Sequence, residues 1–291
     1  MSSPERLPEP SNPLGLDGIE FIEYATSQPR AFGALLEQLG FCAVARHRSR
    51  EVVLYRQGSM NLIVNSHADA LPRQSSPEAA PAIAAVAFRV RDAGFAFKHS
   101  TDRGAWEMPT RAAAMELNIP GIHGVGDSLL YFVDRYRDFS IYEVDFLPIP
   151  GADPRPPAVA GLHYFGVVQS ILPDRSSDWI DFYRSLFGFS VLPHGKYFGV
   201  LPKGTLLESP CHKFYLQLIE PPPGAEEAHW DEGFVRLGLG APDVPAATRA
   251  LTKRGLVFID HGAVQPSDKG ALTQVYMGEV TFELVVSRGM P

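Results

Sequence analysis

Three polar side chains stand inside apolar runs of the sequence, where a charged or titratable group needs a partner. His163 lies in LHYFGVV, Arg236 in FVRLGLG and Glu283 in TFELVV. A buried carboxylate is costly without compensation, and Arg236 is the expected partner of Glu283. Arg236 then has two interpretations. It could form a structural ion pair that holds a sheet closed, or its guanidinium could bind a substrate carboxylate while His163 acts as acid or base. His163 could equally be a hydrogen-bonded core histidine.

The elements that would position these residues follow a pattern repeated four times. Each copy has an apolar strand, an amphipathic helix that ends near a glycine, and two or three further strands. First strands are expected at 18–25, 84–90, 161–168 and 234–240, and closing strands include FSIYEVDF and TQVYMGE. Because one such unit cannot close a core alone, we expect the copies to pair within each half of the chain, curling around a cleft. The expected fold class is therefore α+β.

A stiff segment divides the chain near its midpoint. Residues 148–160, PIPGADPRPPAVA, are rich in proline and poor in large apolar residues, which is typical of a linker. The expected organisation is a loose tail at 1–13, an N-terminal domain at 14–148, a linker at 149–160 and a C-terminal domain at 161–291.

Composition excludes several classes of protein. The 291 residues are 45% hydrophobic and 20% charged, which is ordinary for a globular chain and unlike a disordered one. A net charge of -7 without a long Lys/Arg run argues against a nucleic-acid partner. The apolar runs are too short to cross a membrane, and nothing at the N-terminus is typical of a signal peptide. Cys42 and Cys211 form no CxxC zinc motif. We therefore expect a cytoplasmic protein.

Long collinear segments resemble a known family. Segments in both halves resemble bacterial 4-hydroxyphenylpyruvate dioxygenase. In the first half they are NPLGLDGIEFIEYA, VAFRVRD, MELNIPGIHGVGDSLLYFVDRY and SIYEVDF. In the second half they are LHYFGVV, DFYRSLFGF and TFELVVSRG. The resemblance implies a member of the vicinal oxygen chelate superfamily, which includes glyoxalases. Its fold would be four βαβββ modules paired into two half-barrel domains. The N-terminal domain would be non-catalytic and would supply contacts of a homo-oligomer.

The resemblance also implies a metal site. Enzymes of this family hold iron(II) with two histidines and one carboxylate, leaving positions open for a 2-oxo acid and O2. His163 and Glu283 match the first and last ligands, so they are the metal candidates. Arg236 stands in place of the second histidine, and a guanidinium has no lone pair for a metal. His229 and His261 lie in expected loops from which a substitute ligand could come.

The resemblance further implies substrate-side residues. Gln274 matches a substrate-side glutamine, Tyr276 follows it two residues later, and Gln217 lies at a position where related proteins place a ligand. Pro202 and Ile219 depart from the family pattern. We also expect no counterpart of the family's C-terminal lid helix. Three hypotheses remain: an enzyme with other, metal-free chemistry on a small aromatic or 2-oxo carboxylic acid; a true iron(II) dioxygenase with an unconventional third ligand; and a non-enzymatic small-molecule binding protein.

Overall fold

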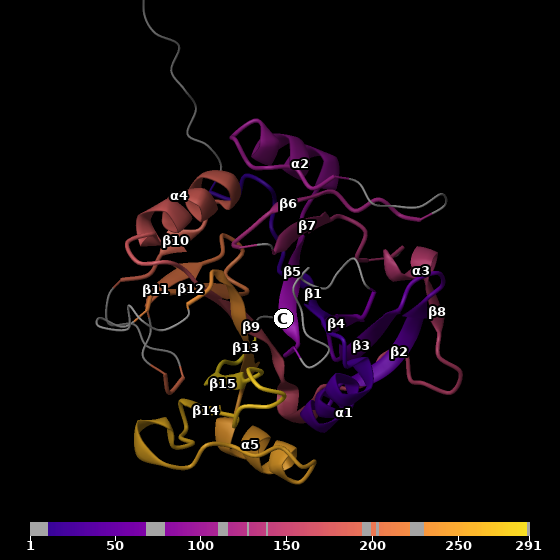
Figure 1. Ribbon diagram of the computed structural model, residues 1–291, viewed down its shortest axis with the longest axis vertical. Helices are drawn as coiled ribbons and strands as arrows, with labels where there is room; N and C mark the ends of the chain where they lie inside the picture. The colour runs from indigo at the N-terminus through magenta and orange to yellow at the C-terminus, as the bar shows by residue number, and fades with distance from the viewer. Residues whose placement is uncertain are drawn as a thin grey trace, which may run out of the picture.

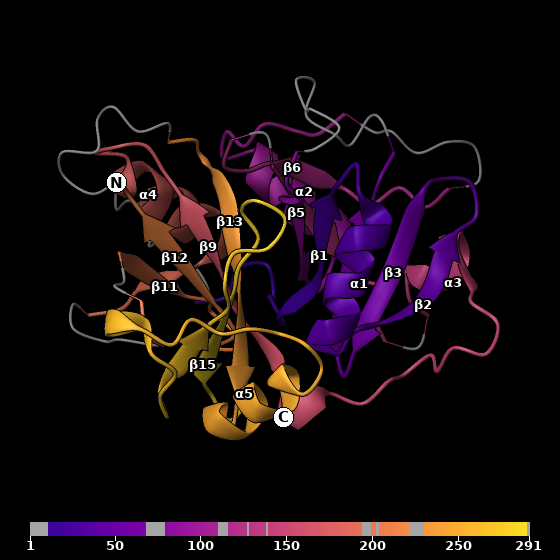
Figure 2. The ribbon, with the colours of Figure 1, turned by 60° about the horizontal axis from the view of Figure 1, so that its bottom comes forward.

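The chain folds into two curved halves that stand side by side, as Figures 1 and 2 show from two directions. A computed structural model describes residues 11–67, 79–109, 116–126, 128–137, 139–193, 199–201, 204–221 and 230–289. The elements are helices and mixed strands, so the fold is α+β as the sequence predicts. None of the described helices is long and apolar enough to cross a membrane.

Strand, helix and further strands follow one another four times along the chain. The first unit contains β1 (Ile19–Ala25), α1 (Pro29–Leu39), β2 (Cys42–His47), β3 (Val52–Gln57) and β4 (Met60–Asn65). The second contains β5 (Ala82–Arg89), α2 (Ala93–Thr101), β6 (Gly121–His123), β7 (Leu129–Val133), α3 (Tyr142–Asp145) and β8 (Phe146–Pro148). The third contains β9 (His163–Ser170), α4 (Ser176–Phe187), β10 (Ser190–Val191), β11 (Thr205–Glu208) and β12 (Tyr215–Ile219). The fourth contains β13 (Gly233–Ala241), α5 (Val244–Thr252), β14 (Gly270–Leu272) and β15 (Phe282–Val286).

Local signals in the sequence explain where the main helices begin and end. Helix α1 starts with Pro29 in its first turn and stops at Gly40, whose φ of 103° is the left-handed conformation that glycine adopts without strain. At α5 the carboxylate of Asp243 accepts a hydrogen bond from the backbone N–H of Ala246 at 2.8 Å, which caps the helix. Helices α1, α4 (Ser176–Phe187) and α5 each bury an apolar stripe.

The strands of both halves form one continuous sheet. At the centre of the C-terminal half, β9 and β13 run antiparallel, and each has a parallel neighbour, β12 beside β9 and β15 beside β13. Strand β13 also meets β5 of the N-terminal half at Phe234 and Ile83. Because β9, β12, β13 and β15 adjoin, alternate side chains of each strand share one inner face.

The main core lies between the helices and the sheet and runs across both halves. Phe88 of β5 is fully buried against two aromatic residues of the C-terminal half, with ring centroids 5.5 Å from Phe187 and 5.4 Å from Phe214. Helix α4 is therefore packed against the N-terminal half as well as its own sheet. Aromatic burial of this kind contributes a large apolar area for each residue.

Two segments expected as strands differ in the structure. FSIYEVDF contains the short helix α3, because Ile141, Tyr142 and Asp145 are buried together at a spacing that one helical face allows and an alternating strand does not. TQVYMGE lies beyond the end of β14. There Tyr276 bridges to Val280 and the chain reverses through Gly278, whose φ is 93°.

Candidate functional site

Arg236 and Glu283 meet on the inner face of the C-terminal half. Their strands are parallel neighbours, with Gly238 opposite Glu283, and the Arg236 Nη1 atom lies 3.7 Å from Oε2 of Glu283. Arg236 also donates from Nε to the hydroxyl of Thr281 at 3.3 Å. Glu283 is almost fully buried, at 1% exposed. The ion pair expected from the sequence is therefore present.

Arg236 is largely buried beside its partner. Burial lowers the pKa of the guanidinium, and the charge of Glu283 and a hydrogen bond with it oppose that shift. The Nη1–Oε2 distance of 3.7 Å is long for a charged pair, and 18% of the Arg236 side chain is exposed. A small part of the side chain is therefore accessible.

A small pocket borders Glu283. Ten residues line it: Phe165, Gly166, Val167, Val168, Leu206, Tyr215, Gln217, Gly238, Glu283 and Val285. The rings of Phe165 and Tyr215 lie against each other with centroids 4.9 Å apart, and Gln217 is buried beside Val168. The cavity measures about 20 Å³, which is room for one water molecule. It is an apolar space with one carboxylate and one amide on its wall.

The backbone at Gly199 comes close to Glu283. A Cβ atom added at this position would lie 2.1 Å from Oε1 of Glu283, so only glycine allows the backbone to come this close. Its φ of 71° is also in the left-handed region that favours glycine. The backbone at Gly199 therefore fills the space beside one carboxylate oxygen, while Arg236 faces the other.

His163 lies on the same sheet but in another place along it. In the antiparallel ladder of β9 and β13, His163 is opposite Gly240, whereas Arg236 is opposite Val168. Both ring nitrogens are engaged, Nδ1 with the carbonyl of Gly161 and Nε2 with the hydroxyl of Ser287, each at 3.0 Å. The structure thus does not bring His163 beside the ion pair, where we expected it.

Gln274 and Tyr276 do not line the pocket beside Glu283. Gln274 is exposed beyond the end of β14, where its backbone N–H donates to the carbonyl of Val257. The hydroxyl of Tyr276 accepts a hydrogen bond from the backbone N–H of Val257 at 2.7 Å. Of the substrate-side candidates, the structure brings only Gln217 to the pocket. Pro202 and His229 lie outside the described residues, and His261 is exposed.

Sequence reasoning missed three residues of this site. Phe165 belongs to the expected strand at 161–168, Gly199 has no side chain that could suggest a role, and Ser287 follows the last strand directly. One feature of the sequence could have predicted that Ser287 lies on the same face as Glu283 and could reach His163. Ser287 lies four residues after Glu283, on the same side of an extended chain, so a polar residue there would share the inner face.

The residues present do not fit an iron(II) centre. Its first expected ligand, His163, has both nitrogens engaged with protein groups, and its second is Arg236. The third, Glu283, has one oxygen against Gly199 and the other facing a guanidinium. The described ranges contain no group of three His, Cys, Asp or Glu residues that could hold a metal ion.

Comparisons with known proteins give the family. Residues 11–147 match the model "Hydroxyphenylpyruvate dioxygenase, HPPD, N-terminal". Hemolysin VllY of Vibrio vulnificus is 34% identical over 264 residues, which are 85% of this chain and 73% of that protein. The chain belongs to the 4-hydroxyphenylpyruvate dioxygenase-like family of the vicinal oxygen chelate superfamily.

Members of the 4-hydroxyphenylpyruvate dioxygenase-like family differ in how much of their length this chain matches. The 4-hydroxyphenylpyruvate dioxygenase of Pseudomonas sp. (strain P.J. 874) is 38% identical over 198 residues, which are 66% of this chain and 55% of that protein. A solved triple mutant of 4-hydroxymandelate synthase from Streptomyces coelicolor superposes with a TM-score of 0.73 at 17% identity, covering 96% of this chain and 94% of that one. The structural likeness shows the shared fold, and the relatives support a dioxygenase-family function in the broad sense.

Proposed function

We propose that this protein uses Arg236 to bind a small aromatic or 2-oxo carboxylic acid in its C-terminal cleft, without the iron(II) reaction of its namesake relatives. The observation that carries the proposal is the position of the guanidinium: it is largely buried on the inner face, its Nη1 atom lies 3.7 Å from Glu283, and 18% of its side chain is exposed. A ligand carboxylate that reaches the exposed part could form charge-assisted hydrogen bonds with it. Glu283 would then orient the guanidinium of Arg236.

The pocket beside Glu283, the partner of Arg236, supports an aromatic ligand. Phe165 and Tyr215 provide ring faces, and Gln217 provides one amide that can accept or donate a hydrogen bond. Since the cavity holds about one water molecule, binding must be coupled to widening of its lining. We assign His163 no acid–base role at Arg236, because its two ring nitrogens contact the carbonyl of Gly161 and the hydroxyl of Ser287. The residues described here therefore support binding more directly than turnover.

The test compares a charged ligand with its neutral isostere. Calorimetric titration of the whole protein with phenylpyruvate, 4-hydroxyphenylpyruvate and 4-hydroxyphenylacetate is set against the matching amides. We expect the acids to bind at least about tenfold more tightly than the amides, because the charged hydrogen bond to Arg236 contributes about 1.5–3 kcal/mol. Arg236→Gln should abolish that preference. Arg249→Gln, the same change on the exposed face of α5, should not.

Two results would overturn the proposal. Acids and amides that bind equally would show that the carboxylate is not recognised by a cation. A preference for the acids that persists in Arg236→Gln would show that the carboxylate binds at another site.

Other results would favour the alternative functions. Stoichiometric iron in protein purified without chelators would favour a dioxygenase with an unconventional third ligand. Tight binding without any consumption of the acids would favour a non-enzymatic binding protein.

A further inference from the structure

The first strand of the C-terminal half has a β-bulge at the wall of the pocket beside Glu283. The ladder of β9 and β13 shifts register between Gly166 and Tyr164, so Phe165 is the extra residue of this bulge. The ladder of β9 and β12 begins at Gly166. A bulge re-aims a side chain, and here the side chain is a ring that lines the pocket. The position of Phe165 therefore depends in part on contacts outside the two ladders.

Tyr164, the residue before Phe165, connects the start of β9 to the N-terminal half. Its hydroxyl donates a hydrogen bond to the backbone carbonyl of Asn61 on β4. Burial raises the pKa of the Tyr164 phenol well above its usual range, so the hydroxyl keeps its proton and stays a donor. Tyr164 packs against the main core, while Phe165 lines the pocket. The hydrogen bond thus holds β9 directly beside the ring of the pocket wall.

Asn61 is itself held in a buried polar cluster of the N-terminal half. It is 5% exposed, and its amide nitrogen donates to Oε1 of Glu20 at 3.2 Å and to the backbone carbonyl of Glu20 at 2.9 Å. Its amide oxygen accepts a hydrogen bond from Nε of Arg56 at 2.7 Å. The other oxygen of Glu20 accepts from Nε of Arg89 at 2.6 Å. Both ends of the Asn61 side chain are engaged, which fixes the stretch of β4 that receives Tyr164.

Glu20 occupies the corresponding bulge of the first unit of the fold. The ladder of β1 and β5 shifts register at Glu20, which is the extra residue there, as Phe165 is in β9. The same place in the repeated unit therefore holds a buried carboxylate in one half and a pocket ring in the other. Hydrogen bonds lead from Glu20 through Asn61 to Tyr164, directly beside Phe165.

We propose that Tyr164 is a positioning residue that holds the Phe165 ring where an aromatic ligand stacks on it. Through Asn61 and Glu20, the N-terminal half thus takes part in ligand selection. This inference rests on the proposed function, because it places the ring of the ligand in the pocket beside Glu283. Stacked rings need a fixed geometry, whereas a flexible alkyl chain adapts to a displaced wall. The contribution of Tyr164 is therefore specific to ligands that carry a ring.

The test compares an aromatic ligand with an aliphatic one. Calorimetric titration of the full chain measures the binding of phenylpyruvate, of 2-oxooctanoate and of the two matching amides. In Tyr164→Phe, the dissociation constants of the aromatic ligands should rise at least about fivefold, and those of the aliphatic ligands less than about twofold. An equal loss for both kinds of ligand would show that Tyr164 has a general structural role, and would overturn the proposal.

Tyr183→Phe is the matched control. The Tyr183 hydroxyl is buried and donates to Oε1 of Gln169 at 2.6 Å, so this variant also removes a phenol hydrogen bond to β9, but one within the C-terminal half. Tyr183→Phe should lower the melting temperature and leave the ratio of aromatic to aliphatic binding unchanged. A ratio that falls as far as in Tyr164→Phe would contradict a specific role of the N-terminal half.

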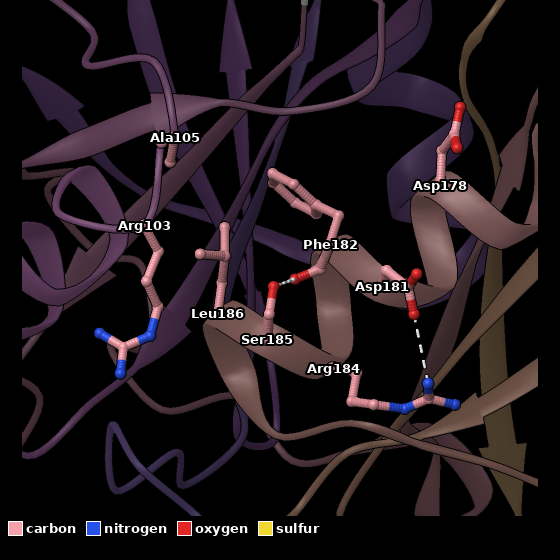
Figure 3. Close-up of a pocket in the computed structure, with 9 residues that line it drawn as sticks. Arg103, Ala105, Asp178, Asp181, Phe182, Arg184, Ser185 and Leu186 are labelled. Carbon is pink, nitrogen blue, oxygen red and sulfur yellow. Dashed lines mark hydrogen bonds and ion pairs between the residues drawn. The ribbon is translucent and has the colours of Figure 1, made fainter.

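A second aromatic surface offers an alternative place for the ring of a ligand. A hollow of about 340 Å³ lies between α4 and the turn after α2, and Figure 3 shows Phe182 of α4 with Arg103 and Ala105 across from the helix. Ser185→Arg changes an exposed residue that lines this hollow, and it should leave the aromatic preference unchanged. A preference that is lost in Ser185→Arg and kept in Tyr164→Phe would place the ring in the hollow and overturn the proposal.

Amide hydrogen exchange tests the connection between the halves without a ligand. Glu20→Ala should speed exchange over residues 163–168 in the other half, because Asn61 loses an acceptor. Glu23→Ala is the control, since Glu23 is another carboxylate of β1 and accepts a hydrogen bond from Asn65 at 2.8 Å. Exchange over 163–168 that both variants change equally, or that neither changes, would overturn the proposal.

The two proposals fail on different results. Acids and amides that bind the wild-type chain equally would remove the role of Arg236, while the ring preference and its loss in Tyr164→Phe would still be measured with the amides. A ring preference that Tyr164→Phe leaves unchanged, together with an intact preference for acids, would overturn the role of Tyr164 alone.

Discussion

The guanidinium of Arg236 faces one oxygen of Glu283 at 3.7 Å on the inner face of the C-terminal half. A positive charge thus stands where the family resemblance implies a metal ligand. The two charges compensate each other at this position. This relationship leads to predictions about activity, stability and ligand binding.

The first prediction concerns oxygen consumption. The purified protein, supplied with iron(II), ascorbate and 4-hydroxyphenylpyruvate, should consume no oxygen above a protein-free control in an oxygen electrode. The reason is that neither His163 nor Arg236 offers an open lone pair to iron beside Glu283. Sustained uptake that requires both the iron and the substrate would contradict this expectation.

The second prediction concerns the energetics of the ion pair. Glu283→Gln should lower the free energy of unfolding by about 3 kcal/mol, because it leaves Arg236 charged and largely buried without its counter-charge. The double variant Arg236→Met/Glu283→Leu should recover most of that loss, since it removes both charges. Urea unfolding measures both effects. A single variant as stable as wild type would mean that Arg236 turns to solvent at no cost.

The third prediction separates backbone strain from steric contact at Gly199. Gly199→Ala should destabilise the fold by about 2–3 kcal/mol, since alanine must adopt a left-handed φ and place its Cβ against Glu283 Oε1. Gly151→Ala is the matched control: its φ is 79°, and nothing lies within 4 Å of an added Cβ. That variant should cost only about 1 kcal/mol. Equal losses in the two variants would show that Gly199 does not touch Glu283.

The fourth prediction uses a buried carboxylate of the N-terminal half. Glu20 is 2% exposed; it accepts a hydrogen bond from Arg89 Nε at 2.6 Å and another from Asn61. Burial raises the pKa of Glu20 above its usual 4.5, and Arg89 opposes the shift. Between pH 4.5 and that raised pKa the folded chain holds a proton that the unfolded chain has lost, so stability falls as the pH rises through this window.

A comparison with Glu20→Gln isolates this effect. The glutamine does not titrate, so the unfolding free energy of wild type relative to the variant should decrease from pH 4.5 upward and then level off. Urea unfolding at a series of pH values measures the difference. A difference that grows with pH would mean that the ion pair with Arg89 outweighs burial and depresses the pKa instead.

The regular elements and the ion pair are predictable from the sequence for a physical reason. Helical spacing and caps are local, so the segments around Phe32, Tyr183 and Asp243 identify α1, α4 and α5. Arg236 and Glu283 are predictable as partners because both are charged within apolar strands, where each needs the other.

The rest of the site depends on contacts that local patterns do not encode. The ladder of β9 and β13 shifts register between Gly238 and Leu239, and its pairing sets His163 against Gly240 instead of beside the ion pair. Gly199 reaches Glu283 from a connection between two strands, so its role depends on the tertiary path of the chain. Tyr276 lies past the end of β14, because the chain reverses there into a tight turn.

The metal content of the protein tests the central claim most directly. The full chain is purified without an affinity tag or chelator, incubated anaerobically with excess iron(II), desalted and measured by inductively coupled plasma mass spectrometry. We predict far less than one iron per chain, and the same in Arg236→Gln, since Gly199 and the engaged His163 remain. One tightly held iron per chain in the wild-type protein would contradict the account.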